Sequence, residues 1–228
     1  MDKKRKISMA VIKRMPRYYR HLAELMRNDV DRISSKQLSE KIGFTASQIR
    51  QDFNNFGGFG QQGYGYNVRD LFNETSKILG LDSKYNTVIV GAGNIGQAIA
   101  NYTRFEKFGF DIKGLFDANP KLKGMTIRGI EIDEVDVLPE FLENNKIDIG
   151  IICVPTNSAQ QVADILVKGG VKGIWNFAPI DINVPKGVAI EAVHLSDSLL
   201  TLVYLMNEIN PDFHSNYQIV DDEDDDEE

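Results

Sequence analysis

The stretch VIVGAGNIGQAIA, residues 88–100, decides the fold of this chain. A short apolar run leads into three glycines spaced as GxGxxG, and small and apolar residues follow at helical intervals. This order predicts a strand, a tight glycine turn and a helix, which is how a dinucleotide-binding unit begins. The unit starts more than a third of the way along a chain of 228 residues, so the residues before it require a separate explanation.

The glycine spacing indicates what the turn binds. Gly91 permits the tight turn, Gly93 lets the backbone approach a pyrophosphate, and Gly96 lets the helix pack on the strand. The phosphates would then meet free N–H groups at a helix N-terminus. Asp117 ends the next strand, 21 residues beyond Gly96, where its carboxylate can accept from ribose hydroxyls and repel the extra phosphate of NADP. NADH or NAD+ is therefore the expected cofactor.

From Thr87 onward, strand-like and helical segments alternate. Apolar runs at 87–92, 112–117, 147–154, 171–177 and 188–193 are separated by helical patterns near 94–107, 134–144 and 157–168. This order predicts an α/β fold with a parallel, doubly wound sheet. Because ligands bind at the carboxyl ends of such strands, the loops 154–156 and 176–179 are expected to flank a nicotinamide ring. The cofactor residues predicted from the glycine motif, the acidic strand end and these loops are Gly91, Ala92, Gly93, Asn94, Ile95, Gly96, Asp117, Val154, Pro155, Thr156, Asn176, Phe177 and Pro179.

The first third of the chain predicts a compact helical module. Pro16 is expected in the first turn of a helix that carries Tyr19, Leu22, Leu25 and Met26 on one face. The segments 34–37 and 45–48 both have capping-box spacing, and Gly43 between them is placed to end a short helix. Two short capped helices joined through a glycine turn predict a helix-turn-helix.

A glycine-rich segment follows the second short helix. Five glycines within residues 57–66 predict a tight β-hairpin, and such a hairpin behind a helix-turn-helix makes a winged helix. Asn67 is then expected to cap another amphipathic helix, which Gly80 would end.

Charge is distributed unevenly along the chain. Residues 1–80 hold 15 basic against 8 acidic residues, whereas residues 81–220 have a balance of -6 and the last eight residues are all acidic. A basic module on an acidic body suggests that the module faces nucleic acid, and the acidic tail is expected to be disordered. The second helix of a helix-turn-helix lies in the major groove, and a dimer on a palindromic operator is expected. The residues predicted to contact DNA from this helix, the wing and the first helix are Thr45, Ser47, Gln48, Arg50, Gln51, Asn54, Gln61, Gln62, Arg14 and Arg17.

Catalytic equipment is not recognisable in the sequence. The histidines are His21, His194 and His214, and no pattern pairs them with a nucleophile or a proton donor. Cys153 is the only cysteine and lies in an apolar run, which excludes a disulfide framework and suggests a buried small hydrophobe. A cofactor sensor is therefore favoured, with no catalytic residue and no metal. The alternative is a small NAD-dependent oxidoreductase with a basic N-terminal extension.

The bulk properties indicate where the protein works. No run approaches 18 apolar residues, the basic N-terminus lacks an apolar secretion segment, and no cysteine pair is present. The cytoplasm is therefore the expected compartment. The helical pattern at 196–207 is apolar around more of its circumference than one sheet face could cover, which makes it the candidate dimer contact.

Five motifs together resemble the Rex family of NADH-sensing transcriptional repressors. They are TASQIRQDFNNFG, GYGY, VIVGAGNIG, the FD at 116–117 and GIWNFAP at 173–179. The resemblance implies a homodimer whose C-terminal helix is swapped into the partner's cofactor domain, with NADH driving release from the operator. The implied domains are a winged helix at 1–82, a Rossmann NAD(H)-binding domain at 83–193, a dimerisation helix at 194–212 and an acidic tail at 213–228.

The resemblance also implies a relay between cofactor and DNA. Tyr102 matches a tyrosine that responds to the bound cofactor form, and Arg20 matches an arginine that transmits the state. His194 occupies the position of the family's relay aspartate, and Asp197 is an alternative. Gln51 and the Gln61–Gln62 pair stand where the family often has basic residues, which should weaken phosphate attraction or change base preference.

Overall fold

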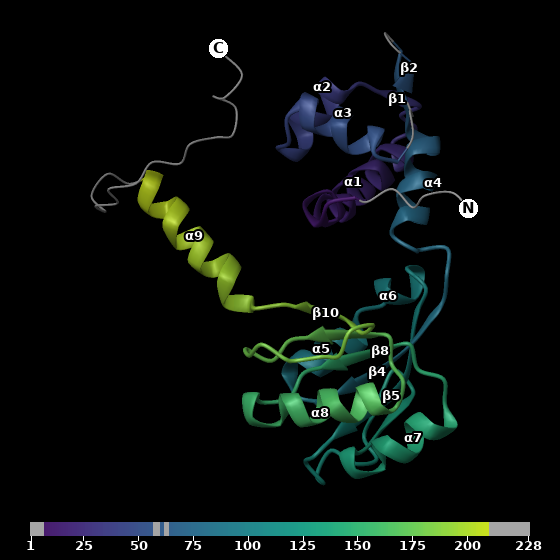
Figure 1. The fold of residues 1–228 in the computed structure, drawn as a ribbon, viewed down its shortest axis with the longest axis vertical. Helices are drawn as coiled ribbons and strands as arrows, with labels where there is room; N and C mark the ends of the chain where they lie inside the picture. Colours follow the sequence, from purple (N-terminus) through teal and green to yellow (C-terminus); the bar gives the residue numbers. More distant parts are fainter. Residues whose placement is uncertain (1–6, 57–59, 62–63, 210–228) are drawn as a thin grey trace. The chain divides into compact units, whose positions relative to one another are not determined.

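Two compact units make up the described part of the chain (Figure 1). The structure, a computed structural model, describes residues 7–56, 60–61 and 64–209. The first unit ends at Asp82 and the second begins at Ser83. Each unit has its own buried apolar core.

The first unit is a bundle of short helices with a small antiparallel sheet. Its elements are α1 Met9–Arg27, β1 Arg32–Ile33, α2 Ser35–Ile42, α3 Ala46–Asn54, β2 Gly60–Gln61, β3 Gly65–Asn67 and α4 Val68–Ile78. The strands lie in the order β1-β3-β2. Apolar faces of all four helices meet in one core that includes Leu22, Leu38, Ile49 and Leu71. The predicted helix-turn-helix and its hairpin are therefore present.

The predicted caps explain where these helices begin and end. Ser34 and Gln37 form a reciprocal capping box at the start of α2, and Gly43 ends that helix with φ 65°. The Thr45 hydroxyl accepts from the Gln48 backbone N–H at 3.0 Å, and Asn67 caps α4. These side chains satisfy backbone groups that a helix end leaves unpaired, so the helix boundaries are set locally.

The expectation for Pro16 is wrong. Ser8 caps α1, and Pro16 lies inside the helix instead of in its first turn. The buried face formed by Val11, Met15, Tyr18 and Leu22 runs through the proline, so core packing outweighs the hydrogen bond that the ring removes.

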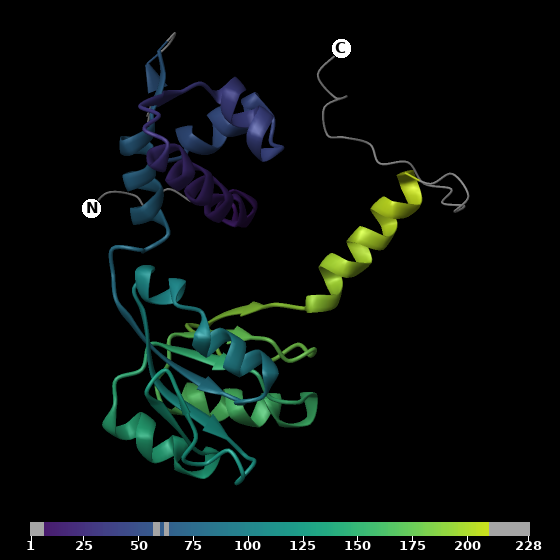
Figure 2. The same cartoon turned by 180° about the vertical axis from the view of Figure 1, so that it is seen from behind.

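The second unit is a sheet covered by helices on both faces (Figures 1 and 2). Within the described residues the sheet has seven strands in the order β10-β9-β8-β4-β5-β7-β6, all parallel except β6. The elements are β4 Tyr85–Val90, α5 Asn94–Asn101, α6 Arg104–Lys107, β5 Phe110–Asp117, β6 Thr126–Ile127, β7 Ile130–Glu134, a 3-10 turn at Val135–Val137, α7 Leu138–Asn144, β8 Ile149–Ile152, α8 Thr156–Lys168, β9 Gly173–Asn176, β10 Ala189–Ala192 and α9 Leu195–Ile209.

Alternation along the central strand builds both halves of the core. Val88 and Val90 pack on one face with α7 and α8, whereas Ile89 packs on the other face with α5. Successive side chains of a strand point to opposite faces, which is why the run VIV is buried throughout. The predicted doubly wound parallel sheet is confirmed.

Two local features differ from the sequence expectations. The helix expected over 94–107 is interrupted, because Tyr102 adopts an extended backbone between α5 and α6. The hairpin of β6 and β7 was not predicted. Its turn places both Arg128 and Gly129 at positive φ, and arginine is an unusual residue for the first position of such a turn.

Candidate nucleotide and nucleic-acid sites

A cavity of about 740 Å³ lies at the carboxyl ends of the parallel strands. Its lining comes from the glycine turn after β4 and the start of α5, the end of β5 and the loop after it, the 3-10 turn and the start of α7, the loops after β8 and β9, and one face of α8. The residues that line it are Val90, Gly91, Gly93, Ile95, Asp117, Ala118, Asn119, Leu122, Val135, Asp136, Pro139, Cys153, Val154, Pro155, Ser158, Gln161, Val162, Ile165, Phe177 and Pro179. A crevice in this place is where open parallel sheets bind ligands.

Two of the motif glycines are required by backbone approach. Gly91 has φ 99°, and a Cβ there would lie 2.5 Å from the carbonyl oxygen of Cys153. A Cβ on Gly96 would lie 1.8 Å from the carbonyl oxygen of Gly91. These positions bring β4, its turn and α5 together, so a side chain at either one would displace the turn.

Asp117 ties the glycine turn to the second strand. One carboxylate oxygen accepts from the Ala92 backbone N–H at 2.6 Å, and the other accepts from Asn119 at 2.7 Å. Each oxygen retains a lone pair, and Asp117 lines the cavity. The predicted contact with ribose hydroxyls is therefore compatible with the position of this side chain.

The loops after β8 and β9 divide into lining and supporting residues. Val154, Pro155, Phe177 and Pro179 line the cavity. Asn176 is fully buried, and its amide donates to the carbonyls of Ala178 and Ile180 and accepts from the Ala178 backbone N–H. Its side chain therefore braces the loop that carries the two lining residues.

The cavity brings together eight of the predicted cofactor residues and several that were missed. Those outside its lining are Ala92, Asn94, Gly96, Tyr102, Thr156 and Asn176. Missed lining residues such as Val135 and Asp136 follow β7, the strand whose hairpin was not predicted. A search for short apolar alternation beyond Gly129 would have found them.

Cys153 also lines this cavity and is half-buried. Burial raises the pKa of its thiol to about 12, so the neutral thiol is the form at neutral pH. The residue is therefore an apolar part of the wall and not a nucleophile.

The candidate nucleic-acid face lies on α3. Ser47, Arg50, Gln51 and Asn54 are exposed, whereas Ile49 and Phe53 are buried in the core. Arg50 donates to the Ser35 hydroxyl at 3.2 Å. The predicted polar face of α3 is therefore exposed and accessible to a ligand such as nucleic acid. Gln61 lies in β2, and Gln62 is outside the described residues.

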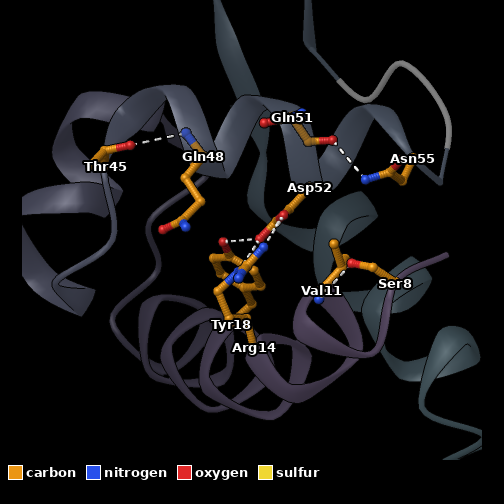
Figure 3. Close-up of polar contacts among 9 residues, drawn as sticks. All are labelled: Ser8, Val11, Arg14, Tyr18, Thr45, Gln48, Gln51, Asp52 and Asn55. Atoms are coloured by element: carbon orange, nitrogen blue, oxygen red, sulfur yellow. Dashed lines mark hydrogen bonds and ion pairs between the residues drawn. The ribbon is translucent and has the colours of Figure 1, made fainter. Parts of the chain in front are cut away.

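The two predicted phosphate contacts on α1 differ in environment. Arg17 is exposed, with its guanidinium 5.1 Å from the centre of the Phe44 ring. Arg14 instead donates twice to the buried carboxylate of Asp52, at 2.6 and 2.7 Å (Figure 3). This ion pair could not be predicted from the sequence, because Asp52 lies 38 residues beyond Arg14 and only tertiary packing brings the two side chains together.

The residues expected to relay the cofactor state lie in both units. Arg20 is exposed on α1, and His194 is half-buried just before α9. Tyr102, at the end of α5, is 46% exposed and packs its ring 4.7 Å from that of Phe105.

Helix α9 presents apolar side chains to solvent in the single chain. The exposed ones are Leu195, Leu199, Leu200, Leu202, Val203, Leu205, Met206 and Ile209. An apolar patch of this extent marks an interaction surface. Within the described residues, no helix is long and apolar enough to cross a membrane, and no group of three or more acidic, histidine or cysteine side chains could hold a metal ion.

Family models match both units. Residues 6–54 match a model described as "Putative DNA-binding protein N-terminus", and residues 82–180 match a CoA binding domain. Coenzyme A and NAD share an adenosine attached to a pyrophosphate, so the second match agrees with a nucleotide cavity.

Curated relatives match nearly the whole chain. The redox-sensing transcriptional repressor Rex of Clostridium novyi (strain NT) is 69% identical over 210 residues, which are 92% of this chain and 100% of that protein. The repressor of the same name from Clostridium botulinum (strain Hall) is 68% identical over 207 residues, 91% of this chain and 99% of that protein.

Solved structures give the same result. The crystal structure of RSP in complex with beta-NAD+ and operator DNA is 62% identical, with a TM-score of 0.85, covering 91% of this chain and 96% of that chain. RSP in complex with beta-NADH is 60% identical, with a TM-score of 0.84, covering 90% and 96%.

Proposed function

The chain belongs to the Rex family of redox-sensing transcriptional repressors, and we infer that it binds operator DNA as a dimer and responds to NADH and NAD+. The cofactors act as effectors, so the protein is a repressor and not an enzyme. One observation carries this inference: identity of 69% extends through both the helix-turn-helix and the glycine motif. The alternative, a small oxidoreductase, has no comparable support.

We propose that the cavity of the second unit holds the dinucleotide. The pyrophosphate would lie over the glycine turn, Asp117 would accept from ribose hydroxyls, and Phe177 with Pro179 would flank the nicotinamide ring. The remaining proposed contacts, with Tyr102 responding to the oxidation state, are those of Ala92, Asn94, Ile95, Val154, Pro155, Thr156 and Asn176. Support comes from the lining of the cavity and from the hydrogen bond between Asp117 and the turn.

Helix α3 is proposed to enter the major groove. Arg50 can pair with guanine, and Gln48, Gln51 or Asn54 with adenine. Thr45, Ser47, Arg17 and the wing residues Gln61 and Gln62 would contact the backbone, which gives affinity without sequence information. The exposure of this face supports the proposal.

Helix α9 is proposed to be swapped into the partner's cofactor domain, and Arg20, Tyr102 and His194 or Asp197 to relay the cofactor state. The exposed apolar residues of α9 support the swap. So does a second, apolar cavity of about 270 Å³ in the cofactor unit, lined by residues such as Phe105, Phe108 and Trp175. The proposed domains are 1–82, 83–193, 194–212 and a tail at 213–228. The proposed compartment is the cytoplasm, where bacterial operators lie.

The test is a titration of operator binding against the NADH/NAD+ ratio at fixed salt. We expect NADH to weaken binding and, by linkage, operator DNA to weaken NADH binding by the same factor. Equal operator affinity with both cofactors would overturn the proposal. Turnover of a hydroxy acid or aldehyde without DNA binding would establish the oxidoreductase.

A further inference from the structure

A buried ion-pair cluster lies behind the candidate DNA-reading face (Figure 3). The Asp52 side chain is 2% exposed and projects from α3 toward α1, away from the exposed polar face. Its carboxylate accepts from Nε and Nη2 of Arg14, and from the Tyr18 hydroxyl at 2.7 Å. Three directional bonds therefore join the two helices at one point.

Aromatic rings enclose this cluster. The Tyr18 ring packs 4.9 Å from Phe53 of α3 and 5.5 Å from Phe44 in the turn between α2 and α3. The Arg14 guanidinium lies 5.8 Å from the Phe44 ring. The hydrogen bond to Asp52 raises the pKa of Arg14, and burial raises the pKa of Tyr18, so both donors keep their protons at neutral pH.

Apolar contacts alone would not fix the rotation of α3. Ile49 and Phe53 hold the helix against the core, but burial of apolar surface is non-directional. The paired bonds from Arg14 are charge-assisted and bidentate, which adds geometric specificity. Asp52 directly follows Arg50 and Gln51 in sequence, so the bonds that hold Asp52 also limit how far those two exposed side chains can rotate with α3.

The cluster also removes a charge from the DNA side of the first unit. Arg14 was predicted to contact phosphate, yet its charge is paired with the carboxylate of Asp52. Breaking this pair by neutralising Asp52 would free one positive charge for phosphate contacts and would loosen the rotation of α3.

We propose that Asp52 is a positioning residue for base recognition: held by Arg14 and Tyr18, it orients α3 and thereby sets the ratio of operator to non-operator affinity. This inference rests on the proposed operator binding. It makes specificity depend on a side chain that faces away from DNA.

The test compares full-length Asp52→Asn with wild type on operator and on scrambled duplex at several salt concentrations. We expect operator affinity to fall so that the ratio drops about tenfold or more, the size of one lost bidentate base contact. Affinity for scrambled duplex should stay equal or rise, because one positive charge is gained. NADH binding reports the second unit and should not change.

Variants that preserve net charge separate orientation from electrostatics. Arg14→Lys keeps the charge but loses the bidentate geometry, and Tyr18→Phe removes one hydrogen bond. Both variants should lower the ratio of operator to scrambled-duplex affinity. If Asp52→Asn fails to fold, these two variants test the proposal in its place. Lys13→Gln, at an exposed neighbour on α1, should leave the ratio unchanged.

Three results would overturn the inference. Equal loss on both duplexes would mean that the cluster only holds the fold together. Equal gain on both would mean that its effect is only electrostatic. If wild type shows no preference for any operator, the proposed function fails first, and this inference fails with it.

Discussion

Single residues in the glycine turn have separable physical roles. Gly91 and Gly96 are required by the packing of the turn itself, because a side chain at either position would meet a backbone oxygen. A Cβ on Gly93, in contrast, would have nothing within 4 Å, and Gly93 lines the cavity. The fold itself therefore does not require glycine at position 93, and the open space beside Gly93 can take a bound group.

This difference predicts the behaviour of Gly93→Ala. The variant should fold with unchanged thermal stability, whereas NADH affinity should fall about tenfold or more, because the new methyl group occupies the approach to the pyrophosphate. Fluorescence titration with NADH measures the loss. Gly96→Ala is the control and should be strongly destabilised. Undiminished NADH binding by Gly93→Ala would place the pyrophosphate elsewhere.

A half-buried histidine, His21, makes the stability of the first unit sensitive to acid. Burial lowers the pKa of His21, and the positive charges of Lys41 and Arg20 lower it further, while Glu24 opposes the shift. Within the described residues, its Nε2 is buried without a hydrogen-bond partner. Folding thus favours the neutral ring, so its stabilising contribution is present above the ordinary pKa of 6.5 and is lost as the pH falls below it.

We therefore expect His21→Leu to flatten the pH dependence of stability. The free energy of unfolding in urea, monitored by hydrogen exchange in α1, is measured at pH 5.5 and 7.5. The difference between the two pH values should be smaller in the variant than in wild type. An identical difference in both proteins would assign the acid sensitivity to other groups.

At this scale the sequence anticipated residues whose role follows from spacing. The glycines form the turn after β4 as the motif predicts, and Asp117 holds that turn through the backbone N–H of Ala92. Asp52 could not be anticipated, because an aspartate on a polar helix is normally solvated, and only tertiary packing brings Arg14 beside it.

Among the elements, the starts of helices could be predicted from local capping residues, whereas features that depend on tertiary packing could not. Helices α2, α3 and α4 begin at the capping residues that the sequence indicates. In α1, the buried apolar face carries the helix through Pro16, contrary to local preference. The hairpin of β6 and β7 was missed because its turn uses arginine at positive φ.

Removing Pro16 from the interior of α1 should increase the stability of the first unit. Replacing it with alanine restores the backbone donor inside α1 and should stabilise the first unit by about 1–3 kcal/mol, since the position is exposed and no packing is lost. Hydrogen exchange resolved by unit is the measurement, with the second unit as internal control. A loss of stability would mean that the proline conformation is itself favourable there.

At the scale of the whole molecule, the chain belongs to the Rex family, and α9 is the surface on which we expect the proposed dimer to depend. The apolar pattern at 196–207 predicted a helix with more apolar surface than one sheet face could cover, and the exposure of α9 in the single chain agrees with this. Periodicity could not identify the surface that covers the helix.

Charge on α9 should therefore dissociate the dimer. Leu200 is 66% exposed in the single chain. Changing it to Glu would remove the favourable free energy of burying its side chain, about 1.5–3 kcal/mol for each copy in the interface. This loss is enough to raise the dimer dissociation constant at least tenfold. Sedimentation across a concentration series measures this. Ser196→Glu introduces the same charge on the same helix at a position without apolar burial, and it should remain dimeric. If Leu200→Glu is equally dimeric, the contact lies elsewhere.

Trp175, the only tryptophan in the sequence, packs its ring 4.6 Å from that of Phe177, which lines the nucleotide cavity. Indole emission overlaps the absorption band of a reduced nicotinamide, whereas the oxidised ring does not absorb there. Excitation of the unlabelled protein should therefore transfer energy to bound NADH and leave emission nearly unchanged with NAD+. The repressor thus contains an intrinsic fluorophore that reports, without a label, whether the bound nicotinamide is reduced or oxidised.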